Sequence, residues 1–179
     1  MKVVLTGEPG IGKTTLVKKA VGVLKDRALG FWTEEVRDPK SGRRTGFKVV
    51  STEGQSVLFA SKTFTSKHLV GSYGVNVQRF EQVALPLLER ALREDKVIVV
   101  DEVGKMELFS KAFKELLRRL VYDPRKRMLL TIPIRDVDPL VAEIRRLRGA
   151  VVLQVDKGNR EDLPQDLLSL LDTGLPTGV

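Results

Sequence analysis

Short apolar runs alternate along the chain with longer stretches in which apolar residues recur every three or four positions. Such runs predict buried strands, and the helical spacing predicts helices that cover a sheet. The runs that predict strands are residues 3–5, 97–100, 128–132 and 151–155. The stretches that predict helices are residues 14–25, 80–92, 109–120, 139–147 and 163–171. This alternation predicts an α/β fold with a mostly parallel central sheet flanked by helices, whose ligands bind at the carboxyl ends of the strands.

Two of these helix predictions depend on prolines. Pro86 lies within the apolar pattern of residues 80–92, so we expect a kink or a helix restart there. Asp138 followed by Pro139 is typical of an N-cap and a first helical residue. This pair places the start of the helix that is expected to run through Leu147.

Residues 29–52 depart from the alternation of strand and helix. Residues 31–37 and 44–50 have strand-like composition, and the turn-forming residues 38–42 lie between them. Residues 56–60 are a candidate third strand. We therefore expect a small antiparallel insertion in an otherwise parallel fold.

The composition is that of one globular domain. The 179 residues are 42% hydrophobic and 30% charged, so we expect a single domain over residues 1–179. No apolar run reaches the length of a membrane-spanning helix, and the chain has no cysteine for disulfides or thiolate metal sites. We expect a cytoplasmic monomer without a membrane partner.

The first predicted strand leads into a phosphate-binding loop. The segment is Gly7-Glu8-Pro9-Gly10-Ile11-Gly12-Lys13-Thr14-Thr15, which contains glycine, four residues and then Gly-Lys-Thr. The glycines allow successive N–H groups to turn toward an anion, and the helix that follows directs its positive end at the same point. Lys13 is expected to reach the β- and γ-phosphates of a nucleotide, and the Thr14 hydroxyl to bind Mg²⁺.

A second candidate segment follows the apolar run 97–100. Asp101 directly after such a run is the Walker B arrangement, in which the aspartate holds Mg²⁺ directly or through water. Glu102 adds a second carboxylate, which is typical of P-loop proteins that activate water. Glu102 is therefore the candidate that orients or deprotonates the water attacking the γ-phosphate.

Residues 101–104 also match the D-x-x-G motif of GTPases. GTPases read guanine through an N-K-x-D motif after a later strand. Residues 156–159 follow the predicted strand 151–155, but their sequence, Asp-Lys-Gly-Asn, does not match that motif. The sequence therefore favours a site that tolerates several bases.

The formal net charge of +8 raises nucleic acid as a partner. Much of the charge lies in residues 118–119, 125–127 and 145–148, on or beside predicted helices. Such clusters are more often solvated surfaces, and a triphosphate site itself needs positive potential. No RNA-binding motif or aromatic platform accompanies them, so nucleic acid is a partner without motif support.

Five blocks of the sequence resemble, in order, the small cancer-related nucleoside-triphosphatase family of thermophilic microbes and animals. They are residues 7–16, 30–37, 44–47, 80–82 and 101–108. The phosphate loop is shared with many families, but Thr-Glu-Glu-Val-Arg at 33–37 and Asp-Glu-Val-Gly-Lys-Met-Glu-Leu at 101–108 are specific. The resemblance extends from Met1 to about Pro133 and is looser beyond.

The resemblance implies a single RecA-like P-loop domain that hydrolyses ATP, GTP, CTP, UTP and other triphosphates to diphosphates. It also implies Mg²⁺ as cofactor and broad base tolerance. The nucleotide-binding segments of the family correspond to residues 7–14 and to Ile98-Val99-Val100-Asp101-Glu102-Val103-Gly104-Lys105. The sequence matches the family motifs at all of these positions.

Several roles near the site stay open. Lys105 is a third catalytic candidate beside Lys13 and Glu102, because it could touch the γ-phosphate, although it could equally be a solvated lysine. Glu107 could support Lys105 or cap the following helix, and Trp32 could stack on the base or pack in the core. A transition-state arginine could be any of Arg37, Arg43, Arg44, Arg79 and Arg135.

Two alternative functions compete with hydrolysis. A nucleotide or small-molecule kinase could have this size, loop and fold, but it needs an acceptor site and usually an arginine-bearing lid. Residues 125–127 have the composition of a lid without an insertion around them. An RNA-associated nucleotide switch would bind RNA in a salt-dependent manner. Glu102 favours water as the acceptor, and so favours the triphosphatase.

Overall fold

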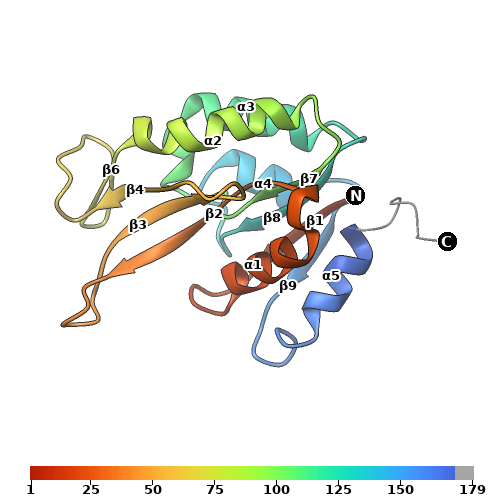
Figure 1. Cartoon of the computed structure of the whole chain (residues 1–179), viewed down its shortest axis with the longest axis horizontal. Coiled ribbons are helices and arrows are strands. Elements are labelled where there is room, and N and C mark those ends of the chain that lie inside the picture. Colours follow the sequence, from red (N-terminus) through yellow and green to blue (C-terminus); the bar gives the residue numbers. More distant parts are fainter. Residues whose placement is uncertain (172–179) are drawn as a thin grey trace.

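The computed structural model describes residues 1–171, and a nine-stranded sheet forms its centre (Figure 1). The strand order is β5-β6-β4-β3-β2-β7-β8-β1-β9. The strands are β1 (Lys2–Thr6), β2 (Ala28–Arg37), β3 (Arg44–Ser51), β4 (Ser56–Ser61), β5 (Leu69–Val70), β6 (Tyr73–Val75), β7 (Val97–Val100), β8 (Arg127–Ile132) and β9 (Val151–Gln154). The α-helices are α1 (Lys13–Leu24), α2 (Val77–Ala91), α3 (Lys111–Val121), α4 (Pro139–Arg145) and α5 (Leu163–Leu171).

Helices cover both faces of the parallel part of the sheet. Helices α1 and α5 lie together on one face, and α2, α3 and α4 cover the other (Figure 1). Successive side chains of a strand point to opposite faces, so Val3 and Leu5 pack in the core under α1 while Val4 packs in the core under α2 and α3. Because both faces are buried, these strands are apolar throughout rather than alternating, as their sequences predicted.

Strand β2 joins the parallel and antiparallel parts of the sheet. It pairs in parallel with β7 from Ala28 to Phe31, and from Phe31 to Arg37 it pairs antiparallel with β3. Strands β4, β6 and β5 extend this antiparallel part, and the β2–β3 hairpin projects from the body of the molecule (Figure 1). The insertion is thus larger than predicted, because β5 and β6 are too short to show a pattern in the sequence.

The predicted helices are present, with three corrections. Of the kink or helix restart expected at Pro86, the restart is wrong, because α2 is one helix in which Pro86 is exposed and the opposite face packs on the sheet; the kink stays a prediction. Helix α4 ends at Arg145 rather than at Leu147, although Asp138 caps it as predicted by accepting a hydrogen bond from the Leu140 N–H at 2.8 Å. Phe109 lies in a 3₁₀ turn, Glu107–Phe109, ahead of α3.

Among the helices of residues 1–171, none combines the length and the apolar character needed to cross a membrane.

The strand order places the two candidate segments at one edge of the sheet. Strand β8 lies between β1 and β7 and is parallel to both, with Thr6 paired to Ile132 and Val100 paired to Leu130. The phosphate loop after β1 and the acidic pair after β7 therefore both emerge at the carboxyl ends of the strands, where ligands bind in folds of this class.

Candidate active site

The phosphate loop connects β1 directly to α1. Gly10 and Gly12 have φ angles of 79° and 116°, in the left-handed region that other residues rarely adopt. The Leu16 N–H donates to the carbonyl of Gly12 at 3.0 Å, so the helix begins immediately after the loop. The positive end of α1 consequently faces the loop, as an anion site requires.

The side chain of Lys13 links this loop to the end of β7. Its ammonium group donates a hydrogen bond to the carbonyl of Gly7 at 2.8 Å and lies 3.5 Å from Oε2 of Glu102. The side chain is only 9% exposed. Lys13 therefore lies between the loop and the acidic pair, where the β- and γ-phosphates of a triphosphate are expected.

Asp101 is held by hydroxyl groups from two different elements. Thr14 donates to its Oδ2 at 2.8 Å, and Thr131 of β8 donates to its Oδ1 at 2.5 Å. Burial raises the pKa of Asp101 to about 6, although both hydroxyl bonds favour the ionised form. The hydroxyl of Thr14 and the carboxylate of Asp101 form an oxygen donor set of the kind that Mg²⁺ prefers, so these residues fit the expected ion.

Glu102 presents the more accessible carboxylate of the pair. Its side chain is 32% exposed, whereas Asp101 is almost fully buried. The Asp101–Glu102 peptide bond is cis. Burial raises the pKa of Glu102, and the ammonium of Lys13 opposes that shift. A partly exposed carboxylate beside a phosphate-binding lysine can hold and deprotonate a water molecule.

Two residues at this edge have contacts that the sequence did not predict. Thr131 binds Asp101, and it is the one polar residue in the otherwise apolar core of β8, which could have identified it. Glu107 does not cap α3, whose N-cap is Ser110, and within residues 1–171 it forms no hydrogen bond or ion pair with Lys105. Its buried carboxyl instead accepts a hydrogen bond from the Gly104 N–H at 3.0 Å.

The predicted binding segment 98–105 divides into a buried and an open part. Ile98, Val99 and Val100 are fully buried in β7, so their side chains support the site rather than face a ligand. Lys105 is exposed, and within the described part of the chain its side chain forms no hydrogen bond or ion pair. The structure thus brings Lys13, Thr14, Asp101 and Glu102 together but leaves the catalytic role of Lys105 a prediction.

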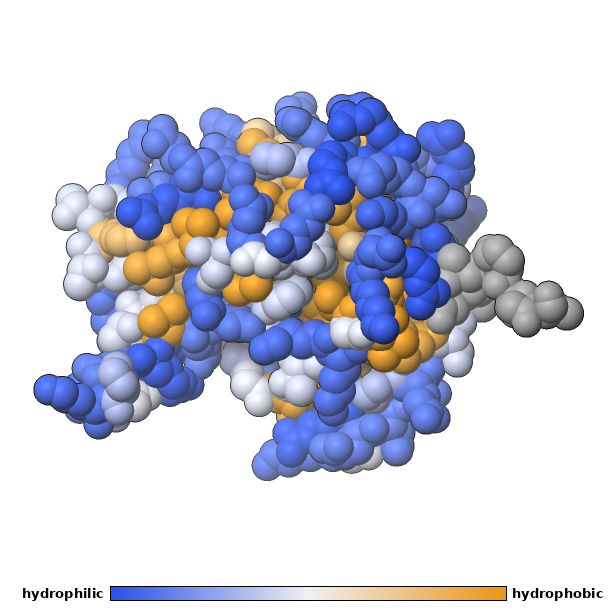
Figure 2. Space-filling model, in the orientation of Figure 1, coloured by the Kyte–Doolittle hydropathy of each residue, from blue (hydrophilic) through white to orange (hydrophobic). Residues whose placement is uncertain are grey.

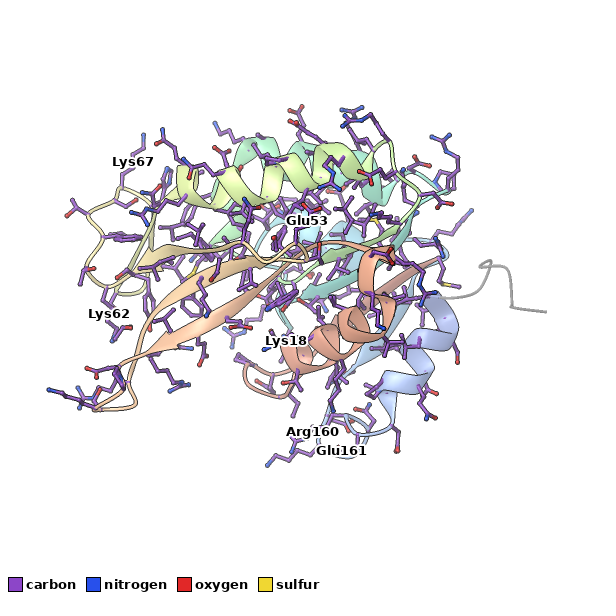
Figure 3. The ribbon with its side chains drawn as sticks, viewed as in Figure 1. Lys18, Glu53, Lys62, Lys67, Arg160 and Glu161 are labelled. Atoms are coloured by element: carbon purple, nitrogen blue, oxygen red, sulfur yellow. The ribbon has the colours of Figure 1, made fainter. Side chains whose placement is uncertain are left out.

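The loop after β9 lies against the other side of the phosphate loop. Arg160 donates a hydrogen bond to the carbonyl of Ile11 at 3.3 Å, from the region labelled at the lower edge of Figure 3. In the same loop the carboxyl of Asp156 accepts hydrogen bonds from the Gly158 and Asn159 N–H groups at 2.8 and 2.9 Å. Figure 2 shows the surface hollowed between this region and the β2–β3 hairpin.

The candidates for base stacking and for the transition-state arginine lie mainly in the antiparallel part of the sheet. The Trp32 indole N–H donates to Glu34 at 2.8 Å and the ring packs against the core under α1, which favours the packing interpretation. Arg37 and Arg44 both pair with Glu35. Within residues 1–171, none of the five candidate arginines forms an ion pair with Glu102, so the structure does not rank them.

The basic residues 125–127 lie at the wrong end of the sheet for a lid. They precede β8 or begin it, so they are at the amino ends of the strands, opposite the phosphate loop. A separate cleft of about 690 Å³ opens at that end and is lined by Pro124, Tyr122 and Arg146 among others. None of the groups that bind Asp101 or Lys13 lines this cleft.

Comparison with known proteins gives consistent matches over nearly the whole chain. A family model described as NTPase matches residues 2–168. The nucleoside-triphosphatase THEP1 of Aquifex aeolicus is 60% identical over 96% of this chain and 99% of its own length. The human cancer-related nucleoside-triphosphatase is 40% identical over 96% of each chain.

Two solved structures share the fold. The crystal structure of THEP1 from Aquifex aeolicus superposes with a TM-score of 0.91 at 59% identity, covering 96% of this chain and 99% of that one. The solution structure of a human cancer-related nucleoside triphosphatase superposes with a TM-score of 0.80 at 40% identity, covering 96% and 97% of the two chains.

Proposed function

The chain belongs to the NTPase family and is a nucleoside-triphosphatase, and we propose that Lys13, Thr14, Asp101 and Glu102 carry out the hydrolysis with Mg²⁺ and little discrimination between bases. The observation that carries this proposal is the meeting of two distant segments at one sheet edge. Lys13 lies 3.5 Å from Glu102, and Thr14 lies 2.8 Å from Asp101. Lys13 and Thr14 thereby each have an acidic partner after β7.

Binding of the triphosphate is the work of the phosphate loop. The backbone N–H groups of the loop and the amino end of α1 supply positive potential without any side-chain movement. The Lys13 ammonium exchanges its bond to the Gly7 carbonyl for the phosphate oxygens, which are stronger acceptors because they are charged. Thr14 and Asp101 hold Mg²⁺, which when bound neutralises charge on the β- and γ-phosphates.

Glu102 acts on the water molecule. Its carboxylate accepts the proton of the water as the water oxygen attacks the γ-phosphorus, and the bond to the bridging oxygen of the diphosphate breaks. A pKa raised by burial makes this carboxylate a better proton acceptor than a solvated glutamate. Lys105 stands as a candidate for contact with the γ-phosphate, since it is exposed three positions further along the same loop.

Broad base tolerance is supported by the loop after β9. The Asp156 carboxyl is engaged by its own turn, so in this arrangement it does not present a free carboxylate to a guanine. We propose that the enzyme acts as a monomer in the cytoplasm, the compartment that supplies nucleoside triphosphates and Mg²⁺. The names of the relatives favour hydrolysis over a kinase activity.

The direct test is release of phosphate from Mg-ATP in the absence of any acceptor. We expect multiple turnovers, dependence on added Mg²⁺, and no increase in ATP consumption when nucleotides or sugars are offered as acceptors. A kinase would instead consume ATP only with its acceptor present. Labelled RNA in the same assay, at low and high salt, tests the remaining alternative, which requires a nucleotide-dependent change in RNA affinity.

A further inference from the structure

Glu107 places a buried carboxyl directly behind the loop that carries Glu102. The residue is 4% exposed, and in the described residues it has no cation as a partner. Its Oε1 accepts the N–H of Gly104 at 3.0 Å. Burying a carboxyl without a cation opposes folding, so its presence here needs a reason beyond packing.

The two carboxyls approach each other across Gly104. A Cβ atom at this position would lie 2.5 Å from Oε1 of Glu102 and 2.7 Å from Oε1 of Glu107. Any residue other than glycine would therefore displace at least one of them. The direction of the Glu102 side chain and the position of Glu107 are coupled through this single residue.

The remaining anchors of the loop are backbone bonds. The Val103 N–H donates to the Thr131 carbonyl at 2.9 Å, and the Leu108 N–H donates to the Gly104 carbonyl at 3.0 Å. The bond from the Gly104 N–H to Glu107 is the one among these three that depends on a side chain. It is therefore the anchor that a substitution can remove while the others stay in place.

The pKa of Glu107 bears on how it can lie close to the carboxylate of Glu102. Burial raises the pKa of Glu107 well above its ordinary value, and the negative charge of Glu102 adds to the rise. This rise favours the neutral carboxyl, which can accept the Gly104 N–H without repelling the carboxylate of Glu102.

We propose that Glu107 is a positioning residue for hydrolysis: by holding the Gly104 N–H, it fixes the direction in which Glu102 presents its carboxylate to water. The inference rests on the function proposed above for Glu102. Within residues 1–171, Glu107 forms no hydrogen bond or ion pair with the phosphate loop or the Thr14–Asp101 pair, so we expect its effect mainly in the chemical step rather than in nucleotide binding.

The first test compares Glu107→Ala and Glu107→Gln. Because small misplacements of a reacting group are costly, we expect Glu107→Ala to lower the single-turnover rate about tenfold to a hundredfold. Affinity for Mg-ATP should change by less than about threefold, since the binding groups are untouched. Glu107→Gln keeps an oxygen acceptor of the same reach and should recover a rate within about fivefold of wild type.

A control and a second variant separate positioning from folding. Glu81 of α2 accepts a hydrogen bond at 2.5 Å from the hydroxyl of Ser110, the N-cap residue of α3. Glu81→Ala removes this carboxyl, so it should lower the melting temperature without lowering the rate of hydrolysis. If Glu107→Ala does not fold, Gly104→Ala tests the same coupling, because it forces the two carboxyls apart with Glu107 present. A wild-type rate in a folded Glu107→Ala or in Gly104→Ala overturns the inference.

The double variant Glu102→Gln/Glu107→Ala decides whether Glu107 acts through Glu102. If it does, the double variant should be no slower than Glu102→Gln alone, whereas independent roles multiply the two losses. Multiplied losses overturn the inference and leave the function of Glu102 intact. A wild-type rate in Glu102→Gln alone would instead overturn the proposed mechanism, and the positioning role with it.

Discussion

The ammonium of Lys13 and the carboxylate of Glu102 lie 3.5 Å apart, although 89 positions separate them in the sequence. The pair joins the residue expected to bind the γ-phosphate to the residue expected to activate water. A phosphate that draws Lys13 away from the Gly7 carbonyl therefore arrives beside Glu102. Nucleotide binding and water activation therefore meet at the Lys13–Glu102 contact, yet substitutions of the two residues should have different effects on affinity and rate.

Substitution of Lys13 should remove binding and turnover together. In Lys13→Ala the phosphates lose their charged side-chain donor and Glu102 loses its cation, so Mg-ATP affinity and hydrolysis should each fall at least about a hundredfold. Equilibrium binding of a fluorescent ATP analogue and phosphate release measure the two effects. Lys18→Ala is the matched control, because Lys18 lies on the same helix (Figure 3) and its ammonium pairs with Glu34 at 3.0 Å instead. Hydrolysis at the wild-type rate by Lys13→Ala would contradict the phosphate-loop assignment.

Replacement of Asp101 by asparagine should stabilise the metal-free protein against unfolding but impair hydrolysis. The pKa of this carboxyl rises from 3.8 to about 6 on folding, so the folded state takes up a proton between these values and the contribution of Asp101 to stability falls as pH rises through that window. Asp101→Asn avoids the buried charge and should stabilise the metal-free protein by at most about 3 kcal/mol at pH 8.

Urea denaturation at pH 5 and pH 8 without Mg²⁺ measures this gain, which should be larger at pH 8. The exposed Asp95→Asn, whose carboxylate is 93% exposed, should show no such difference. Asp101→Asn should also need far more Mg²⁺ for any residual hydrolysis, because it loses a charged oxygen ligand. Equal stability of wild type and variant at pH 8 would show that the Asp101 charge is not destabilising.

Thr131 should influence the acid limb of the activity profile at limiting Mg²⁺, because it binds Asp101. Its hydroxyl bond to Asp101 favours the carboxylate, so Thr131→Val should raise the pKa of the metal-free Asp101 further and move the acid limb of the rate at limiting Mg²⁺ to higher pH. Rates measured from pH 5 to 8 at limiting Mg²⁺, where a proton on Asp101 competes with the ion, reveal the shift. Thr45→Val removes a hydroxyl that bonds Val36 in the hairpin and should leave the profile in place. An unshifted limb in Thr131→Val would mean that another group controls it.

The local parts of the candidate site could be predicted from the sequence. Lys13 and Thr14 follow from the spacing of the loop glycines, and Asp101 and Glu102 follow from the end of an apolar run; the matches to THEP1 and the human enzyme confirm the family resemblance. These features depend on residues adjacent in the chain, where backbone geometry and solvent exclusion act directly.

The contacts between segments could not be predicted in the same way. Thr131 reaches Asp101 only because β8 lies between β1 and β7, and this order is a property of the whole sheet. The carboxyl of Glu107 accepts the Gly104 N–H at a point where a side chain on residue 104 would collide with it. The spacing of these residues in the sequence does not reveal this contact. Strands β5 and β6 pair with each other, and β6 pairs with β4; neither strand is long enough to show a periodicity of its own.

Base selectivity should be weak. The proposed site grips phosphates and metal, and Asp156 is bound within its own turn, so discrimination among ATP, GTP, CTP and UTP should stay within about tenfold in kcat/KM, or roughly 1.4 kcal/mol. Competition assays with mixed triphosphates measure the ratios directly. A thousandfold preference for one base would reveal a base-reading element elsewhere in the chain.

Glu102 should separate binding from chemistry. Backbone N–H groups, Lys13 and Mg²⁺ hold the phosphates, and none of them needs this carboxylate, whose proposed contribution arises only in the transition state. Glu102→Gln keeps the size and a hydrogen-bonding group but cannot accept the proton of water. Loss of a general base typically costs a hundredfold to ten-thousandfold, about 2.7 to 5.4 kcal/mol.

We therefore expect Glu102→Gln to bind Mg-ATP within about threefold of wild type and to hydrolyse it at least about a hundredfold more slowly. Rapid-quench measurement of a single turnover isolates the chemical step from product release. The pKa of Glu102 is raised by burial, so the wild-type single-turnover rate at saturating Mg²⁺ should fall as pH drops through that raised value, while the residual rate of the variant under the same conditions should lack this limb. A single-turnover rate equal to wild type would make Glu102 a structural residue, and water activation would then have to come from another group at the same sheet edge.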